Sequence, residues 1–191
     1  MNENWIHLCI DMQRVFAEDT PWHVPWMREV SPQIEEIASR YAQRTMFTRF
    51  ITPEKPEQMP GMWRAYYEKW RTMTREQLDP RLLDIVPTLT HLVPPARVFD
   101  KLTYSPWISG ELHQILSRDG VDAIVLTGGE TDVCVLATAM GAIDLGYRVI
   151  ALRDAVCSGA DETHDASLEV LGDRFSVQLD LITTEEFLSS L

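Results

Sequence analysis

The chain has 191 residues, 45% of them hydrophobic and 24% charged, proportions typical of one compact globular domain rather than of a disordered or fibrous chain. Its 17 basic and 29 acidic side chains give a formal net charge of -12, and no lysine or arginine cluster is present, so nucleic acids and anionic membranes are not expected partners. The 3 cysteines show no CxxC spacing, which argues against a disulfide framework and a structural zinc site.

The sequence shows no segment typical of export or membrane insertion. The first four residues, MNEN, are polar and acidic, so we expect no export signal. The longest apolar stretch runs from Cys134 to Ile143, is interrupted at Thr138, and is too short to span a bilayer. With the unpaired cysteines, these features predict a protein of the reducing cytoplasm.

Short apolar runs alternate with helical patterns along the chain. The first run, from Trp5 to Ile10, predicts a buried strand that ends at Asp11. Further strands are predicted at 45–50, 97–99, 123–126, 149–152 and 177–182, and helices at 32–41, 109–118, 131–145, 161–171 and from 183 onward. The alternation predicts a single domain over residues 1–191, with a three-layer α/β/α, Rossmann-like fold around a mostly parallel six-stranded sheet.

One interval breaks this alternation. Residues 51–61 contain three prolines and lead into an aromatic segment at 62–70. Long excursions between strands often cover active sites. A surface loop followed by a short helix fits the same residues, and both interpretations stay open.

The segment 124–134 predicts a buried strand, a tight glycine turn and the start of a helix. Gly128 and Gly129 permit a sharp turn that can direct amide N–H groups toward one point. Cys134 then falls in the first helical turn, where the helix dipole favours a thiolate and hence a nucleophile. A buried core cysteine and a phosphate-binding turn are the alternatives, although the turn lacks the P-loop and GxGxxG patterns.

Two further side chains follow predicted strands. Asp11 ends the first strand and Lys101 follows the strand at 97–99, so in a parallel sheet both lie at the carboxyl edge, as Cys134 does. A carboxylate, an ammonium and a thiol at one edge supply a base, an electrostatic partner and a nucleophile. Taken singly, Asp11 or Lys101 is more typical of a surface ion pair, and it is their shared edge that favours a functional site.

These residues resemble the isochorismatase-like cysteine hydrolases over nearly the whole chain. The pattern comprises Asp11-x-Gln13, Lys101, Gly128-x-x-Thr131-x-x-Cys134-Val135, Ala139, Ala142, Gly146-Tyr147-x-Val149 and Asp154-Ala155. The resemblance implies a catalytic triad of Asp11, Lys101 and Cys134. It also implies a cis peptide between Gly129 and Glu130, which would direct the amides of Glu130 and Cys134 as the oxyanion hole.

One departure from the family pattern bears on whether a metal takes part in the reaction. Nicotinamidases of this family bind a metal through an Asp-x-His after the second strand, but that position here reads Phe50-Ile51-Thr52-Pro53-Glu54. The 5 histidines are scattered without ligand spacing, so we expect no metal and no other cofactor.

The resemblance and the residues together favour acyl transfer. We expect a cysteine hydrolase that cleaves the C–N bond of a small amide, carbamoyl or ureido substrate through a thioester. Two alternatives stay open: a vinyl-ether hydrolase, in which the aspartate acts as acid and the cysteine is not required, and a catalytically silent thiol sensor or binding protein. We also expect a homo-oligomer, by resemblance alone.

Aromatic residues near the predicted crevice suggest a pocket for a flat or apolar substrate part. Our candidates are Phe16, Trp63, Tyr104 and Trp107, although tryptophans are equally suited to a subunit interface. Arg14, Arg49 and Arg64 are candidates for binding a substrate carboxylate, or else surface charges.

Overall fold

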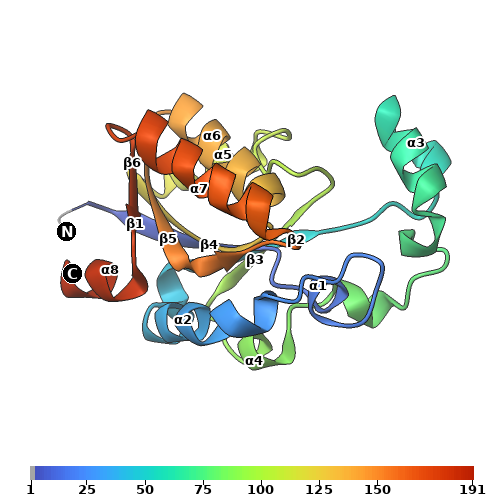
Figure 1. Ribbon diagram of the computed structural model, residues 1–191, viewed down its shortest axis with the longest axis horizontal. Helices are drawn as coiled ribbons and strands as arrows, with labels where there is room; N and C mark the ends of the chain where they lie inside the picture. The colour runs from blue at the N-terminus through green and yellow to red at the C-terminus, as the bar shows by residue number, and fades with distance from the viewer. Residues whose placement is uncertain (1–2) are drawn as a thin grey trace.

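A computed structural model describes residues 3–191 (Figure 1). Its central sheet has six strands in the order β3-β2-β1-β4-β5-β6, and each neighbouring pair is parallel. The strands are β1 (Trp5–Ile10), β2 (Thr45–Phe50), β3 (Arg97–Lys101), β4 (Ala123–Gly129), β5 (Arg148–Cys157) and β6 (Leu179–Ile182). The predicted fold class is therefore confirmed.

Helices lie between the consecutive strands, as is typical of a parallel sheet, whose connections are generally right-handed. They are α1 (Arg14–Ala17), α2 (Met27–Arg40), α3 (Met62–Lys69), α4 (Pro87–Thr90), α5 (Glu111–Arg118), α6 (Leu136–Asp144), α7 (Asp161–Arg174) and α8 (Thr184–Ser189). Short 3-10 turns lie at Ala42–Arg44, Pro56–Gln58, Arg71–Met73 and Pro80–Leu83, and a π-helical turn at Thr131–Val135 precedes α6. No helix among residues 3–191 is long and apolar enough to cross a membrane.

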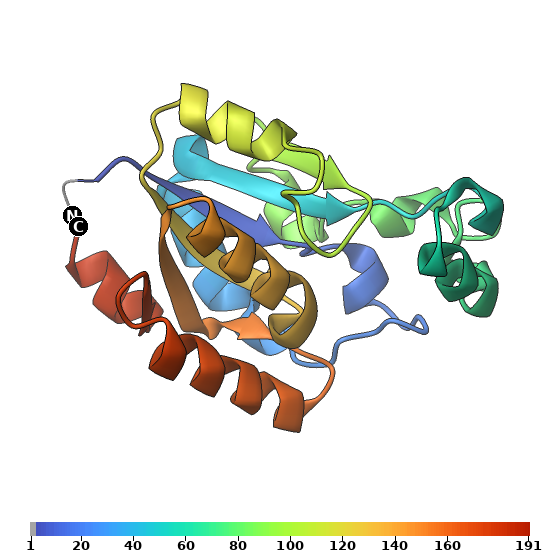
Figure 2. The same cartoon turned by 90° about the horizontal axis from the view of Figure 1, so that it is seen from above.

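The helices cover the sheet on two faces. Helices α5, α6 and α7 lie over one face, and α2, α4 and α8 lie over the other (Figures 1 and 2). Apolar side chains of β1 and β4 alternate between the two sides, so Leu126 joins the core under α5 and α6 while Val125 joins the core over α2. Both strands are buried along their length, which holds their carboxyl ends rigidly.

The strand order reverses between β1 and β4. The chain adds β2 and β3 on one side of β1 and then crosses to place β4, β5 and β6 on the other. At such a switch point, the loops leaving the two central strands diverge and leave a crevice at the carboxyl edge of the sheet, where ligands bind in open α/β folds.

Several elements extend beyond their predicted bounds, among them β5 and α2. Strand β5 continues past Leu152 to Cys157, because Val156 and Cys157 pair with Gly128 and Gly129 after a register shift in β4. Helix α2 begins before Pro32 at Met27, although proline favours the first turn of a helix. The Ser31 hydroxyl donates to the Met27 carbonyl, 2.8 Å away, within this added first turn.

The proline-rich excursion forms a separate cluster of short helices. Helix α3 stands away from the layered body, beyond the carboxyl end of β2 (Figure 1). Its Tyr67 is fully buried, and Trp63 and Tyr66 pack against the same core. The excursion therefore contributes side chains to the crevice as well as surface.

Candidate active site

Asp11 lies directly after β1 and is almost fully buried. Its φ of 49° falls in the left-handed region, which aspartate tolerates better than most residues. The Thr48 hydroxyl, from β2, donates to Asp11 Oδ1 at 2.6 Å and accepts from the Asp11 amide at 3.1 Å. These two bonds fix both the backbone and the carboxyl group of Asp11.

Lys101 ends β3 and reaches across to Asp11. Its Nζ lies 2.7 Å from Asp11 Oδ2, and the two side chains are 2% and 1% exposed. The same nitrogen donates to the Cys134 sulfur at 3.5 Å and to the Thr103 carbonyl at 3.1 Å. Burial alone would lower the pKa of Lys101, but the Asp11 and Cys134 groups outweigh it and hold that pKa above its ordinary value, so the amine stays charged.

The turn after β4 places Cys134 beside this pair. Gly128 has a φ of 102°, and a Cβ there would come within 2.1 Å of the Ile10 carbonyl oxygen, so glycine is needed where β4 passes β1. The peptide bond between Gly129 and Glu130 is cis. The Glu130 carbonyl then accepts from the amides of Val133 and Val135 at 3.1 and 3.0 Å, which closes the π-helical turn around Cys134.

The Cys134 thiol differs from the sequence-based prediction of a thiolate. Burial raises the pKa of Cys134, and Lys101 lowers it only in part, while hydrogen bonding and charge from Asp11 raise it further. The resting site therefore holds a neutral thiol, and the hydrogen-bonded Asp11 is the group placed to accept its proton.

A cavity of about 190 Å³ opens over Cys134. The residues that line it are Phe16, Pro21, Trp22, His23, Phe50, Tyr66, Tyr104, Glu130, Val133 and Cys134. Its size suits a small molecule, and its wall is largely aromatic. The site thus brings a buried thiol, a carboxylate and an ammonium group together below a small, largely aromatic cavity.

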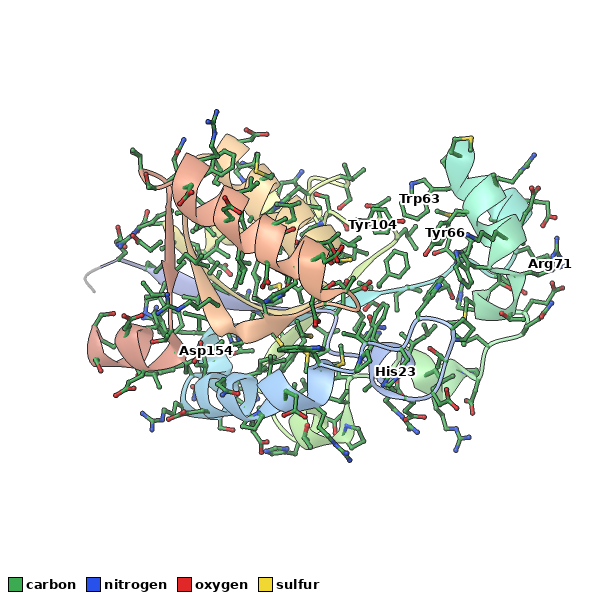
Figure 3. The ribbon with its side chains drawn as sticks, in the orientation of Figure 1. His23, Trp63, Tyr66, Arg71, Tyr104 and Asp154 are labelled. Atoms are coloured by element: carbon green, nitrogen blue, oxygen red, sulfur yellow. The ribbon has the colours of Figure 1, made fainter. Side chains whose placement is uncertain are left out.

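Of the four predicted pocket residues, Phe16 and Tyr104 line this cavity and the other two do not. Trp63 packs behind Tyr104, with 4.8 Å between ring centroids, and lines a separate hollow with Met62, Tyr66 and Tyr104 (Figure 3). Its position on the outer side of Tyr104 keeps it from the cavity wall.

Trp107 lies away from the cavity, against α6. Its Nε1 donates to the Thr138 carbonyl at 2.9 Å. Its ring packs directly on Gly141, because a Cβ added to Gly141 would lie only 2.3 Å from Trp107 Cδ1. It also stacks on Tyr147 with ring centroids 5.8 Å apart. Trp107 therefore braces the helix that follows Cys134 and does not contact the cavity.

Sequence reasoning missed Phe50 and Tyr66 as pocket residues. Phe50 ends β2 at the same edge as Asp11, so its place at a strand end was the available signal. Tyr66 comes from α3, and only the fold of the proline excursion brings it over the crevice (Figure 3). Three arginines proposed for a substrate carboxylate lie elsewhere: Arg14 pairs with Glu18, Arg49 with Asp100, and Arg64 donates to the Glu57 carbonyl.

A polar network fixes the outer side of the catalytic turn. Asp132 accepts from the hydroxyls of Ser158 and Thr163, at the end of β5 and the start of α7. His164 hydrogen-bonds through Nδ1 to the Thr131 hydroxyl at 2.9 Å. The turn that carries Glu130 and Cys134 is thus held from β5 and α7 as well as from β4.

The residues present do not fit a nicotinamidase-type metal site. The segment after β2 supplies Thr52, Pro53 and Glu54 rather than an aspartate and a histidine. Across residues 3–191, no three His, Cys, Asp or Glu side chains gather closely enough to hold an ion.

Residues 6–185 match the family model described as the isochorismatase domain. A probable inactive nicotinamidase of Arabidopsis thaliana is 32% identical over 180 residues, which cover 88% of this chain and 89% of that protein. Maleamate amidohydrolase of Pseudomonas putida is 29% identical over 94 residues, 49% of this chain and 43% of that protein. The match spans less than half the length of the first curated relatives, 47% and 43%.

Among solved structures, a cysteine hydrolase from Pseudomonas syringae superposes with a TM-score of 0.83 at 22% sequence identity. The superposition covers 97% of this chain and 91% of that one. This likeness shows that the two proteins share a fold.

Proposed function

The chain belongs to the isochorismatase family, and on that premise we propose that it is a cysteine-dependent hydrolase that cleaves the C–N bond of a small amide, carbamoyl or ureido compound. The observation that carries the proposal is the contact of Lys101 Nζ with both Asp11 Oδ2, at 2.7 Å, and Cys134 Sγ, at 3.5 Å, below the cavity. The maleamate amidohydrolase among the relatives supports the amide as the bond that is cleaved.

Acylation begins with the neutral thiol. Asp11 accepts the Cys134 proton as the sulfur attacks the carbonyl carbon, and the carbonyl oxygen becomes an oxyanion. The amides of Glu130 and Cys134 donate to that oxygen. When the C–N bond breaks, Asp11 returns the proton to the leaving nitrogen, so ammonia or an amine departs and a thioester remains on Cys134.

Deacylation reuses the same carboxylate. Asp11 accepts a proton from a water molecule as that water attacks the thioester carbonyl. The C–S bond breaks, the carboxylic acid forms, and the proton returns from Asp11 to the sulfur. Throughout both halves, the buried Lys101 ammonium offsets the negative charge shared by Asp11 and Cys134.

Ammonia or amine release by purified, metal-stripped protein over a panel of small amides and ureides tests this proposal, with Cys134→Ala beside it. We expect release by the native protein and its loss in the variant. Release that survives in Cys134→Ala but fails in Asp11→Asn would instead indicate amide hydrolysis that uses the Asp11 carboxyl group without a thioester. No release from any compound would favour the silent alternative, which the probable inactive Arabidopsis relative keeps open.

The proposal also covers the cellular location and the oligomeric state of the enzyme. All three cysteines are unpaired and buried, and Cys134 must stay reduced to act, which suits the cytoplasm. We also propose a homo-oligomer, because Met62 and Ile108, 81% and 75% exposed, leave large apolar side chains uncovered near the site. Light scattering on the purified protein measures the oligomeric state directly.

A further inference from the structure

The ionisable groups that line the cavity over Cys134 include an acid but no strong base. Among the described residues, its lining includes Glu130 as an acid and no lysine or arginine. The nearby Lys101 ammonium is balanced by Asp11 at 2.7 Å, so this pair adds little net charge to the chamber. Glu130 is therefore the acid of the pocket wall without a cationic partner in the lining. Burial and the charge of Asp132 raise the pKa of Glu130, so a cation beside this carboxyl group would favour its ionised form.

The Glu130 side chain lies inside the site rather than in solvent. The Gly159 amide donates to its carboxyl group, and a Cβ on Gly159 would lie 3.4 Å from Glu130 Oε1. The carboxyl is close enough to act electrostatically on the phenols of Tyr66 and Tyr104 and on the Cys134 thiol. Glu130 thus belongs to the lining of the chamber in which a substrate would sit, and its carboxyl group lies beside Gly159.

Aromatic rings form the rest of the wall. Trp22 is 6.3 Å from Phe16, 6.0 Å from Phe50 and 6.0 Å from Tyr66, measured between ring centroids. Tyr104 continues the wall at 6.2 Å from Phe50. A cavity lined by aromatic rings together with a carboxylate suits a cation, because ring faces carry negative charge and attract an ammonium group. Phe50 already contacts one such group, with Lys101 Nζ 5.1 Å from its centroid.

The negative charge of Glu130 also opposes the chemistry in the empty site. It disfavours a thiolate on Cys134 and an oxyanion beside it. A positive group on the ligand would offset this charge at the moment when the sulfur attacks. A cationic ligand would therefore both bind in the chamber and remove an electrostatic obstacle to acylation.

We propose that the cavity selects amides whose remote end carries a positive charge, such as a primary ammonium or trialkylammonium group, held by Glu130 and the aromatic wall. The inference rests on the proposed function for the amide bond, whereas the charge preference rests on the cavity. The overall charge of -12 supports it by drawing cations toward the protein.

A matched pair of amides tests the proposal. 4-(Trimethylammonio)butanamide and 5,5-dimethylhexanamide share one shape and differ in carrying N⁺ or C at the branch point, and glutaramate supplies an anionic end. We expect kcat/KM for the cationic amide to exceed that for its neutral isostere by at least about tenfold, equivalent to about 1.4 kcal/mol, with glutaramate slowest. Equal or reversed rates would overturn the proposal.

Two variants separate the local charge from the overall charge. Glu130→Gln should reduce the cationic-to-neutral ratio by at least about fivefold, because a neutral amide replaces the carboxylate. Glu169→Gln removes one exposed acid from α7 and should leave the ratio unchanged. A ratio preserved in Glu130→Gln would mean that its side chain acts as a neutral donor, and this result would also overturn the proposal.

A binding measurement keeps the two proposals distinguishable. Isothermal titration calorimetry on Cys134→Ala compares the same three amides without turnover, and we expect at least about tenfold tighter binding of the cation. Such binding without hydrolysis by the native protein would contradict the proposed function and support the charge preference. Hydrolysis with equal affinities and equal rates would support the function and overturn the preference.

Discussion

Lys101 Nζ lies 2.7 Å from Asp11 Oδ2, and neither side chain is more than 2% exposed. Thr48, Thr103 and Cys134 complete the polar contacts of the pair. Two charges this deeply buried stabilise each other, because removal of either side chain would leave the other as an unpaired charge in the protein interior. The contact on which the proposed mechanism rests therefore also supports the fold.

Removing the Lys101 charge should destabilise the protein. Lys101→Met keeps most of the side-chain volume but leaves Asp11 buried and uncompensated, so the free energy of unfolding should fall by about 3–5 kcal/mol. Urea unfolding measures this change. Lys55→Met is the matched control, because Lys55 pairs with Glu76 at 3.5 Å with both side chains exposed, and its loss should cost less than about 1 kcal/mol. Equal effects of the two variants would contradict the account.

The raised pKa of Cys134 predicts slow alkylation in the free protein. Burial keeps the thiol neutral, so iodoacetamide should modify Cys134 more slowly at pH 7 than it modifies an exposed thiol, and the rate should rise steeply with pH. Peptide mapping after timed quenching separates Cys134 from Cys9 and Cys157, whose pKa values burial raises to about 12. A fast rate that is already constant between pH 6 and pH 8 would indicate a preformed thiolate.

The burial of His7 predicts that the free energy of unfolding falls at acidic pH. Its ring hydrogen-bonds to Thr45 and Thr127 at 3.1 and 2.8 Å, and burial lowers its pKa from 6.5 to about 3. The unfolded chain therefore binds a proton below pH 6.5 that the folded protein does not, so stability is full above this value and falls toward pH 3. Between pH 7 and pH 5 the loss from His7 should be about 2 kcal/mol.

His7→Gln provides the comparison for this effect. Glutamine does not titrate, so the variant should lose less stability than the native protein over the same interval, when both are measured by urea unfolding. Carboxyl groups contribute equally to both proteins and cancel in the difference. Parallel pH profiles would show that His7 is not the group responsible.

Much of this arrangement follows from the sequence because a parallel sheet brings distant strand ends to one edge. Asp11, Lys101 and the Gly128 turn each follow an apolar run. Their closeness in the fold could therefore be predicted before any contact between them was known. The state of the thiol could not, since it depends on how completely loops from elsewhere bury Cys134. Aromatic identity likewise did not distinguish Tyr104, on the cavity wall, from Trp107, which packs on α6.

Chelation should leave hydrolysis unchanged. The residues after β2 do not supply the aspartate and histidine of a nicotinamidase metal site, and across residues 3–191 no three suitable side chains gather. Rates measured before and after dialysis against EDTA should agree. A loss of activity that added zinc or iron restores would contradict the absence of a metal in the proposed mechanism.

Trapping the acyl intermediate tests the central claim most directly. During turnover of a substrate amide, rapid acid quenching followed by mass spectrometry should show the acyl group as added mass on the peptide that contains Cys134, and treatment with hydroxylamine should remove it. Asp11→Asn should not accumulate this adduct, because it lacks the base that accepts the thiol proton. Turnover at the native rate by Cys134→Ala, with no adduct on the native protein, would contradict the thioester mechanism.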